Sequence, residues 1–170
     1  MVIESIFREI IKKMNTITVY KQQRMLECVS GQQVLLACGI GLGPHSLGHK
    51  TCEGDGKTPE GRYAVCTRNT KSKYALFLGL NYPSIKDAQY ASEMGRITAA
   101  GLEAITAAHA NSLRPPWDTP LGGQIGIHGG GIEIGGKLTD STAGCIALRD
   151  ADIRMLWPLA PIGTPVIILP

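Results

Sequence analysis

The sequence is poor in aromatic residues and in charge of either sign. Aromatic residues make up 5% of it and charged residues 18%, and the net charge of +3 is spread over scattered lysines and arginines with no block of like charge. A chain that binds nucleic acid ordinarily carries a basic patch, so this composition predicts no nucleic-acid partner. At most, the small positive balance favours an anionic partner.

Long apolar runs are also missing, and none reaches the roughly 18 residues that a membrane-spanning helix needs. Residues 1–14 carry apolar side chains at helical spacing, but charged residues interrupt them in a way that no secretory signal peptide tolerates. We therefore predict a short amphipathic helical extension over residues 1–15 and a single domain over residues 16–170. We expect neither a membrane span nor a signal peptide.

No CxxC pair is present among the cysteines. The five cysteines are Cys28, Cys38, Cys52, Cys66 and Cys145. Their odd number leaves at least one thiol free in a monomer, and disulfides among the first four stay open. His45, His49 and Cys52 lie in one glycine-rich loop, but three zinc ligands without a fourth make solvated polar residues the better interpretation. We expect no metal ion and no other cofactor.

Glycine and proline are plentiful, with 21 and 10 residues in a chain of 170, and they favour a β-rich fold over a helix bundle. Apolar patterns predict strands at residues 16–20, 25–29, 34–38, 62–67, 74–80, 124–127 and 163–169. The continuous apolar run at 34–38 is typical of a strand that is buried on both faces. Helical spacing predicts helices within residues 84–112 and at 150–157, with Asp150 as the N-cap of the latter.

Two further stretches predict loops beside a functional site. Residues 39–61 are rich in glycine, and a loop of this length is uncommon unless it has a function. Residues 113–120 contain Pro115, Pro116 and Pro120, which remove backbone donors and fix φ. We expect this second loop to form one wall of a cleft.

The reactive side chains are concentrated in one segment, residues 125–148. It contains His128, followed by three glycines, and Cys145, preceded by Gly144. A cysteine thiol is only slightly ionised at neutral pH, so a catalytic one needs a base nearby, and His128 can supply it. We predict an oxyanion hole formed by the amide of Cys145, assisted by Gly144 or by the hydroxyl of Thr142. The pair predicts acyl transfer; a satisfied polar histidine and a buried thiol are the alternative.

Four ordered motifs extend this hypothesis over most of the chain. They are His128-Gly129 with Thr142-Ala143-Gly144-Cys145-Ile146, then Gly54-Asp55-Gly56-Lys57-Thr58-Pro59-Glu60-Gly61-Arg62-Tyr63, Leu80-Asn81-Tyr82-Pro83, and Gly163-Thr164-Pro165-Val166. Together they resemble the L,D-transpeptidase catalytic domain of the YkuD type. The resemblance implies a mainly β fold, sandwich-like or barrel-like, with one or two helices inserted before the catalytic segment.

The resemblance also implies an activity on peptidoglycan. Enzymes of this family attack the peptide bond after the third residue of a stem peptide, release a terminal D-amino acid, and pass the acyl group from a thioester to an acceptor. On that basis Cys145 is the nucleophile, His128 the general base, and the carbonyl of Gly129 the group that orients the imidazole. Stem peptides are the implied partners, and carbapenem-type inhibitors are expected to bind. The implied location is the cell envelope or periplasm, although residues 1–14 carry no export signal that we recognise.

The chain departs from the commonest form of the motif, Ser-His-Gly-Cys-Ile-Arg. Ala143 and Ala147 stand where the second histidine and the arginine would be, which removes two polar groups expected near the substrate. We expect Arg149 to bind substrate in place of the missing charge, with a solvated arginine ahead of the helix as the alternative. Three functions stay open: a transpeptidase, a carboxypeptidase or amidase that hydrolyses the same acyl-enzyme, and a non-catalytic wall-binding module. The acceptor, whether a stem amine, a protein lysine or water, is left open as well.

Overall fold

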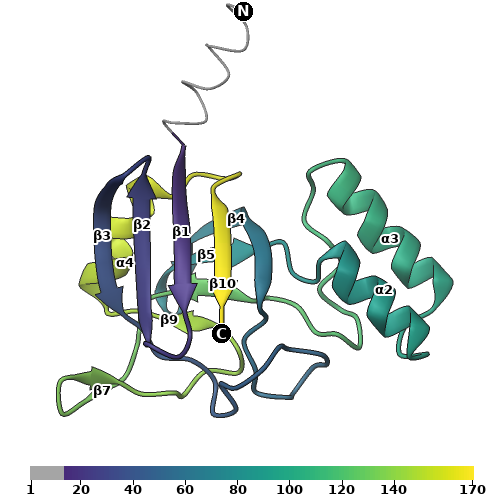
Figure 1. Cartoon of the computed structure of the whole chain (residues 1–170), viewed down its shortest axis with the longest axis horizontal. Coiled ribbons are helices and arrows are strands. Elements are labelled where there is room, and N and C mark those ends of the chain that lie inside the picture. Colours follow the sequence, from purple (N-terminus) through teal and green to yellow (C-terminus); the bar gives the residue numbers. More distant parts are fainter. Residues whose placement is uncertain (1–13) are drawn as a thin grey trace, which may run out of the picture.

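A curled eight-stranded sheet forms the body of the protein in the computed structural model, which describes residues 14–170 (Figure 1). Its strands are β1 (Asn15–Tyr20), β2 (Met25–Ser30), β3 (Gln33–Gly39), β4 (Gly61–Ser72), β5 (Ala75–Leu80), β6 (Gly126–His128), β9 (Ile146–Ala147) and β10 (Pro165–Leu169). A separate hairpin consists of β7 (Glu133–Ile134) and β8 (Lys137–Leu138). The helices are α2 (Ile85–Glu93), α3 (Ala99–Ala110), α4 (Asp150–Leu156) and the 3₁₀ turn η1 (Trp157–Leu159).

The two edges of the sheet come together and make it barrel-like. The strand order is β3-β2-β1-β10-β4-β5-β6-β9, so the last strand lies at the centre, parallel to β1 and antiparallel to β4. Just after β3, Gly41 forms a bridge with Ala147 of β9, with N–H to O distances of 2.9 and 2.8 Å in the two directions. The predicted mainly β fold, with helices inserted before the catalytic segment, is therefore confirmed.

Burial alternates along the central strands, as the sequence pattern predicted. Ile17 and Val19 of β1 are fully buried, as are the side chains of Val166 and Ile168 in β10. Side chains of successive strand residues point to opposite faces, so the curled sheet buries one continuous set of apolar residues.

Strand β3 contradicts one prediction. Residues 34–38 were expected to be buried on both faces, but Val34 is 54% exposed and only Leu36 lies in the core. The reason is that β3 pairs with β2 alone and forms an edge of the sheet. An apolar run cannot distinguish an edge strand from a central one, because that depends on pairing with distant segments.

The helical segment predicted over residues 84–112 consists of two helices. Ser84 caps α2 in a capping box with Asp87, and Thr98 caps α3 by accepting a hydrogen bond from the amide of Gly101 at 3.1 Å. The helices share a small apolar cluster of their own, made of Ala88, Ala91, Ile105 and Leu121. They lie together at one side of the sheet (Figure 1).

The N-cap of helix α4 lies one residue earlier than predicted. Arg149 is the N-cap, without a side-chain capping bond, and Asp150 is the first helical residue. The carboxylate of Asp150 instead accepts a hydrogen bond from the amide of Gly130 at 2.7 Å. The prediction that Asp150 is the N-cap was therefore wrong, because this side chain fixes the glycine-rich loop that follows His128.

All five cysteines are free thiols, so none of the disulfides left open by the sequence forms. The amphipathic helix predicted over residues 1–15 lies outside the described residues up to residue 13, and Asn15 already belongs to β1. Within residues 14–170, no helix combines the length and the apolar character needed to cross a membrane.

The glycine-rich loop after β3 folds around one carboxylate. Asp55 accepts hydrogen bonds from the amides of Thr51 at 2.8 Å and Lys57 at 3.0 Å, and its Oδ1 lies 2.9 Å from Nζ of Lys50, which is buried. Burial acts to raise the pKa of Asp55, but the hydrogen bonds from Lys50 and the loop amides outweigh it and lower that pKa. The Gly-Asp-Gly motif therefore gives this loop its shape.

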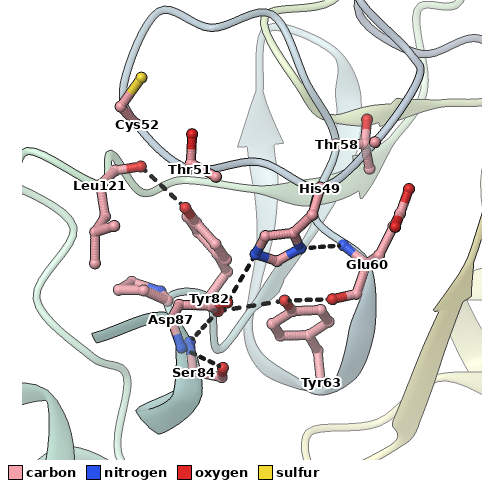
Figure 2. A network of polar contacts seen from close by, with 12 residues as sticks. His49, Thr51, Cys52, Thr58, Glu60, Tyr63, Tyr82, Ser84, Asp87 and Leu121 are labelled. Atoms are coloured by element: carbon pink, nitrogen blue, oxygen red, sulfur yellow. Dashed lines mark hydrogen bonds and ion pairs between the residues drawn. The ribbon is translucent and has the colours of Figure 1, made fainter. Parts of the chain in front are cut away.

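A second polar network joins the same loop to α2 (Figure 2). Nδ1 of His49 accepts a hydrogen bond from the amide of Glu60 at 2.9 Å, and Nε2 lies 2.9 Å from Oδ1 of Asp87. Asp87 also accepts from the amide of Ser84 at 2.7 Å and from the hydroxyl of Tyr63 at 3.3 Å. Both ring nitrogens of His49 are thus used inside the protein.

Candidate active site

His128 and Cys145 line one cavity of about 580 Å³. Strands β6 and β9 are parallel neighbours in which His128 pairs with Ala147, and Cys145 directly precedes β9. Alternate residues of a strand point to the same face, so Cys145 lies on the same side of the sheet as Ala147 and His128. The register of this short parallel pair therefore brings the two predicted residues into one site.

The imidazole of His128 is buried beside aromatic rings. It is 4% exposed, and it stacks on Tyr74 with the ring centroids 4.3 Å apart and, more loosely, on Phe77 at 6.3 Å. Nδ1 lies 2.6 Å from the carbonyl oxygen of Gly129, the contact that the family resemblance implied. A carbonyl only accepts, so Nδ1 carries the hydrogen and Nε2 carries the lone pair.

The free nitrogen distinguishes His128 from an ordinary structural histidine. Among residues 14–170, Nε2 of His128 has no hydrogen-bond partner. Burial lowers the pKa of His128, with the Gly129 carbonyl acting in the opposite direction and the charge of Lys73 adding to the lowering. At neutral pH the imidazole is therefore uncharged and able to accept a proton.

Cys145 rests as a thiol. Its Sγ donates to the carbonyl oxygen of Gln124 at 3.3 Å. Burial raises the pKa of Cys145 to about 11, although the amide of Gly126 and the charge of Lys50 act to lower it. The resting pair is therefore a thiol beside a neutral imidazole, and not a thiolate–imidazolium ion pair.

Hydrogen bonds within the turn at residues 142–145 hold its shape. The hydroxyl of Thr142 donates to the carbonyl of Cys145 at 2.7 Å and accepts from the amide of Gly144 at 3.1 Å. Both groups predicted to assist the oxyanion hole are thus engaged within the turn. Among residues 14–170 the amide of Cys145 itself has no acceptor, so it is the donor left for a substrate.

Only glycine fits the position before Cys145. Gly144 has a φ of +129°, and a Cβ added there would lie 2.5 Å from the carbonyl oxygen of Lys57. The amide of Thr142 also donates to the carbonyl of Leu42 at 3.0 Å. The loop after β3 therefore packs against the turn that precedes Cys145.

The other motifs belong to the scaffold. In the Leu80–Pro83 motif, the side-chain oxygen of Asn81 accepts from the amide of Ala64 at 2.7 Å, and the hydroxyl of the buried Tyr82 donates to a backbone carbonyl in the loop before β6. In the closing motif, the hydroxyl of Thr164 donates to the carbonyl of Pro161 at 2.7 Å. These motifs fix strand ends and connections around the cavity.

Arg149 does not line the cavity of Cys145 and His128, where its charge was expected to bind substrate. Its guanidinium donates to the carboxylate of Glu133 and, at 3.0 Å, to the carbonyl of Gly136, so it joins the β7–β8 hairpin to α4. It does not line the cavity, in which the charged lining residues are Lys73 and Glu53. Neither of these two lies in a motif, and sequence reasoning missed both.

Three aromatic residues around the cavity were also not predicted individually. Tyr74 and Phe77 come from the β4–β5 hairpin and match an ordinary strand pattern. Phe77 reaches His128 by pairing across β5 and β6, and Tyr74 stacks on the imidazole. Trp117 lies in the loop 113–120 and lines the cavity, which confirms the prediction that this loop forms one wall.

The loop residues weighed as zinc ligands have other contacts. Nδ1 of His45 lies 2.9 Å from the carbonyl oxygen of Asp55, and His49 contacts Glu60 and Asp87. Across the described part of the chain, no three histidine, cysteine or acidic side chains are grouped as metal ligands.

Several solved structures share this fold. Bd1075 from Bdellovibrio bacteriovorus is 24% identical, with a TM-score of 0.59 over 92% of this chain and 48% of that one. The helical cell shape determining protein Pgp2 from Campylobacter jejuni is 21% identical, with a TM-score of 0.61 over 91% of this chain and 47% of that one. An Enterococcus faecium L,D-transpeptidase C442S mutant is 13% identical, with a TM-score of 0.53 over 92% of this chain and 50% of that one.

The chain spans about half the length of these structures, and their likeness shows the fold alone. No curated protein sequence matches it. Residues 14–168 do match the family described as YkuD: L,D-transpeptidase catalytic domain. Since that match covers nearly the whole described chain, the protein belongs to the YkuD family of L,D-transpeptidase catalytic domains.

Proposed function

We propose that this chain is a cysteine-dependent L,D-transpeptidase that acts on peptidoglycan stem peptides through a thioester acyl-enzyme. The observation that carries the proposal is the pairing of Cys145 with His128 in one cavity, where Nδ1 of His128 is bound to Gly129 and Nε2 is left available. Family membership supplies the class of substrate. The proposed location is the cell envelope, where stem peptides are found.

Acylation begins with rotation of the thiol from the Gln124 carbonyl toward His128. As Sγ of Cys145 bonds to the carbonyl carbon of the third stem residue, the thiol proton passes to Nε2 of His128. The amide of Cys145 donates to the oxygen that becomes negative. The C–N bond then breaks, and the imidazolium returns the proton to the leaving amine of the D-amino acid.

Deacylation runs through the same groups. An acceptor amine attacks the thioester carbon and loses a proton to Nε2 of His128 while the C–S bond breaks. The sulfur of Cys145 then takes that proton back, so the new amide leaves an unchanged enzyme. If water replaces the amine, the same steps give a carboxylic acid, which is the hydrolytic alternative.

The raised pKa of the thiol determines how His128 acts. With its pKa raised to about 11, Cys145 is mostly a thiol at pH 7. The attack therefore needs a base to take the thiol proton, and His128 is the proposed acceptor. The lowered pKa of His128 keeps the imidazole neutral for this role.

Incubation with disaccharide-tetrapeptide stems tests the proposal, with products resolved by mass and the Cys145→Ala variant as control. Cross-linked dimers formed by the native chain alone are the expected result. Tripeptides without dimers would replace the transferase by a hydrolase. Unchanged tetrapeptide, with binding retained, would replace both by a non-catalytic wall-binding module.

A further inference from the structure

A second cavity, of about 410 Å³, adjoins the one that holds Cys145. Lys73, Tyr74, Phe77, Trp117 and Gln124 line both cavities, so the two share a wall. The second cavity adds only polar, uncharged residues and two further cations, Lys71 and Arg114. We call it the basic cavity, because Lys71, Lys73 and Arg114 line it and no acidic residue does.

The cations of the basic cavity have no acidic partner. Among residues 14–170, none of Lys71, Lys73 and Arg114 lies within 4.0 Å of a carboxylate. Lys73 and Arg114 instead lie over aromatic rings, with Nζ 4.9 Å from the Tyr74 ring and Cζ 4.6 Å from the Trp117 ring. The buried lysines differ from these, because Lys21 and Lys50 each pair with a carboxylate.

The backbone that carries these lysines is ordered by local contacts. Near the end of β4, the side-chain oxygen of Asn69 accepts from the amide of Lys71 at 2.8 Å. The hydroxyl of Ser72 accepts from the amide of Tyr74 at 3.1 Å. The same hairpin places Tyr74 against His128, so the basic cavity and the imidazole are parts of one structural unit.

We propose that the basic cavity binds carboxylates of the stem peptide whose scissile bond lies at Cys145. This inference rests on the proposed function and names the part of the chain that recognises the acidic donor. A tetrapeptide stem with diaminopimelate carries several carboxylates on an extended backbone, and unpaired lysines and an arginine are the groups that bind them. The shared wall lets one peptide occupy both cavities.

The location of these cations accounts for the unusual motif. Ala147 lines the catalytic cavity where the commonest motif carries an arginine, and Arg149 is engaged with the β7–β8 hairpin. The cations near the site come instead from the end of β4, the β4–β5 turn and the loop that contains Arg114. The cations that recognise the donor peptide thus belong to the β4–β5 hairpin and the Arg114 loop, and not to the strand that follows Cys145.

A binding measurement on inactive protein tests this inference. The Cys145→Ala variant is titrated calorimetrically with the stem tetrapeptide L-Ala-γ-D-Glu-diaminopimelate-D-Ala and with the same peptide carrying amides in place of its carboxylates. We expect tighter binding of the acidic form, and we expect Lys71→Gln with Arg114→Gln to weaken that binding about tenfold or more. The double change should leave the amidated peptide within about twofold, and raised salt should reduce the difference between the peptides.

Arg154→Gln is the matched control, because Arg154 is an exposed cation on α4 that lines neither cavity. It should leave both affinities unchanged, and equal melting temperatures would show that all variants fold. Equal binding of the two peptides, or equal losses in the double variant and the control, would overturn the inference. If binding shows no preference for the acidic peptide but the native chain still cross-links stems, only this inference is wrong. If binding prefers the acidic peptide but the native chain shows no turnover, only the proposed function is wrong.

Discussion

The polar centres around His128 and around His49 use the same side chain in opposite ways. His49 accepts from the amide of Glu60 with one nitrogen and contacts the carboxylate of Asp87 with the other, so the whole ring is committed to the fold (Figure 2). His128 is bound to the protein through Nδ1 alone, by the carbonyl of Gly129, and lines the cavity with Cys145. A base needs one anchored nitrogen and one available nitrogen, and of these two residues His128 meets that requirement.

The difference follows from where the two residues lie. His49 is in the middle of a loop that packs against α2, and contacts from both sides take both nitrogens. His128 ends a short strand and lines a cavity, and its ring stacks on Tyr74. Stacking fixes the plane of the imidazole without using either nitrogen.

The largest effect is expected at the nucleophile. Exposure to a carbapenem should give one covalent adduct in the native chain, and Cys145→Ala should give none, because no other cysteine lines the cavity. Intact-protein mass measures this directly. An adduct that survives the substitution would place the nucleophile elsewhere.

His128→Ala should reduce the acylation rate by at least ~100-fold, because it removes the general base for a thiol that is not ionised. The rate is followed by stopped-flow or by timed mass spectra with the same carbapenem. His49→Ala is the matched comparison and should change this rate far less. Equal losses in the two variants would mean that His128 acts through the fold and not as a base.

Asp55→Asn should destabilise the protein by about 3 kcal/mol, because it leaves the buried Lys50 without its counter-charge. The folded pKa of Asp55 is lowered, so its contribution is complete above the unfolded pKa of about 3.9 and is lost as pH falls through the folded value. Urea unfolding should therefore show a gap between native and variant proteins at pH 7 that narrows below about pH 4. A gap that stays constant in acid would contradict this account.

His49→Ala should cost about 1–2 kcal/mol of stability, since it removes the acceptor for the Glu60 amide and one contact of Asp87. Thermal or urea unfolding measures the loss. His49→Gln, which keeps a hydrogen-bonding side chain, should recover part of it. A variant as stable as the native chain would show that the network in Figure 2 adds nothing to folding.

The smallest effect concerns the pH dependence of acylation. The lowered pKa of His128 keeps the base neutral in mildly acidic solution, so the rate should fall only below the ordinary histidine range, about 6.5. Lys73→Gln removes a charge that opposes protonation, and the acidic limb of the profile should move to higher pH. A limb that moves to lower pH, or stays in place, would contradict the contribution of Lys73.

Local patterns predicted much of this molecule. Alternation located β1, β2 and β10, and the spacing of glycine and proline located the loops. His128 and Cys145 could be singled out from the sequence because each lies beside glycine, and the structure places both at one cavity.

Features that depend on long-range pairing were not predictable. Whether β3 lies at an edge is decided by partners far along the chain, and so is the contact of Tyr74 with His128. Arg149 illustrates the same limit: a cation near the motif has no direction until the β7–β8 hairpin supplies Glu133 as its partner. A residue's closeness to the motif in the sequence therefore does not determine where its side chain points.

The hydrogen bond from Cys145 to the carbonyl of Gln124 also bears on how readily this thiol is oxidised. Oxidants react with thiolates, and the nucleophile is stored as a thiol whose pKa is raised to about 11. Burial likewise raises the pKa of Cys66 to about 11 and that of Cys38 to about 12. In four of the five cysteines, Cys28, Cys38, Cys66 and Cys145, burial thus favours the thiol over the thiolate that oxidants attack.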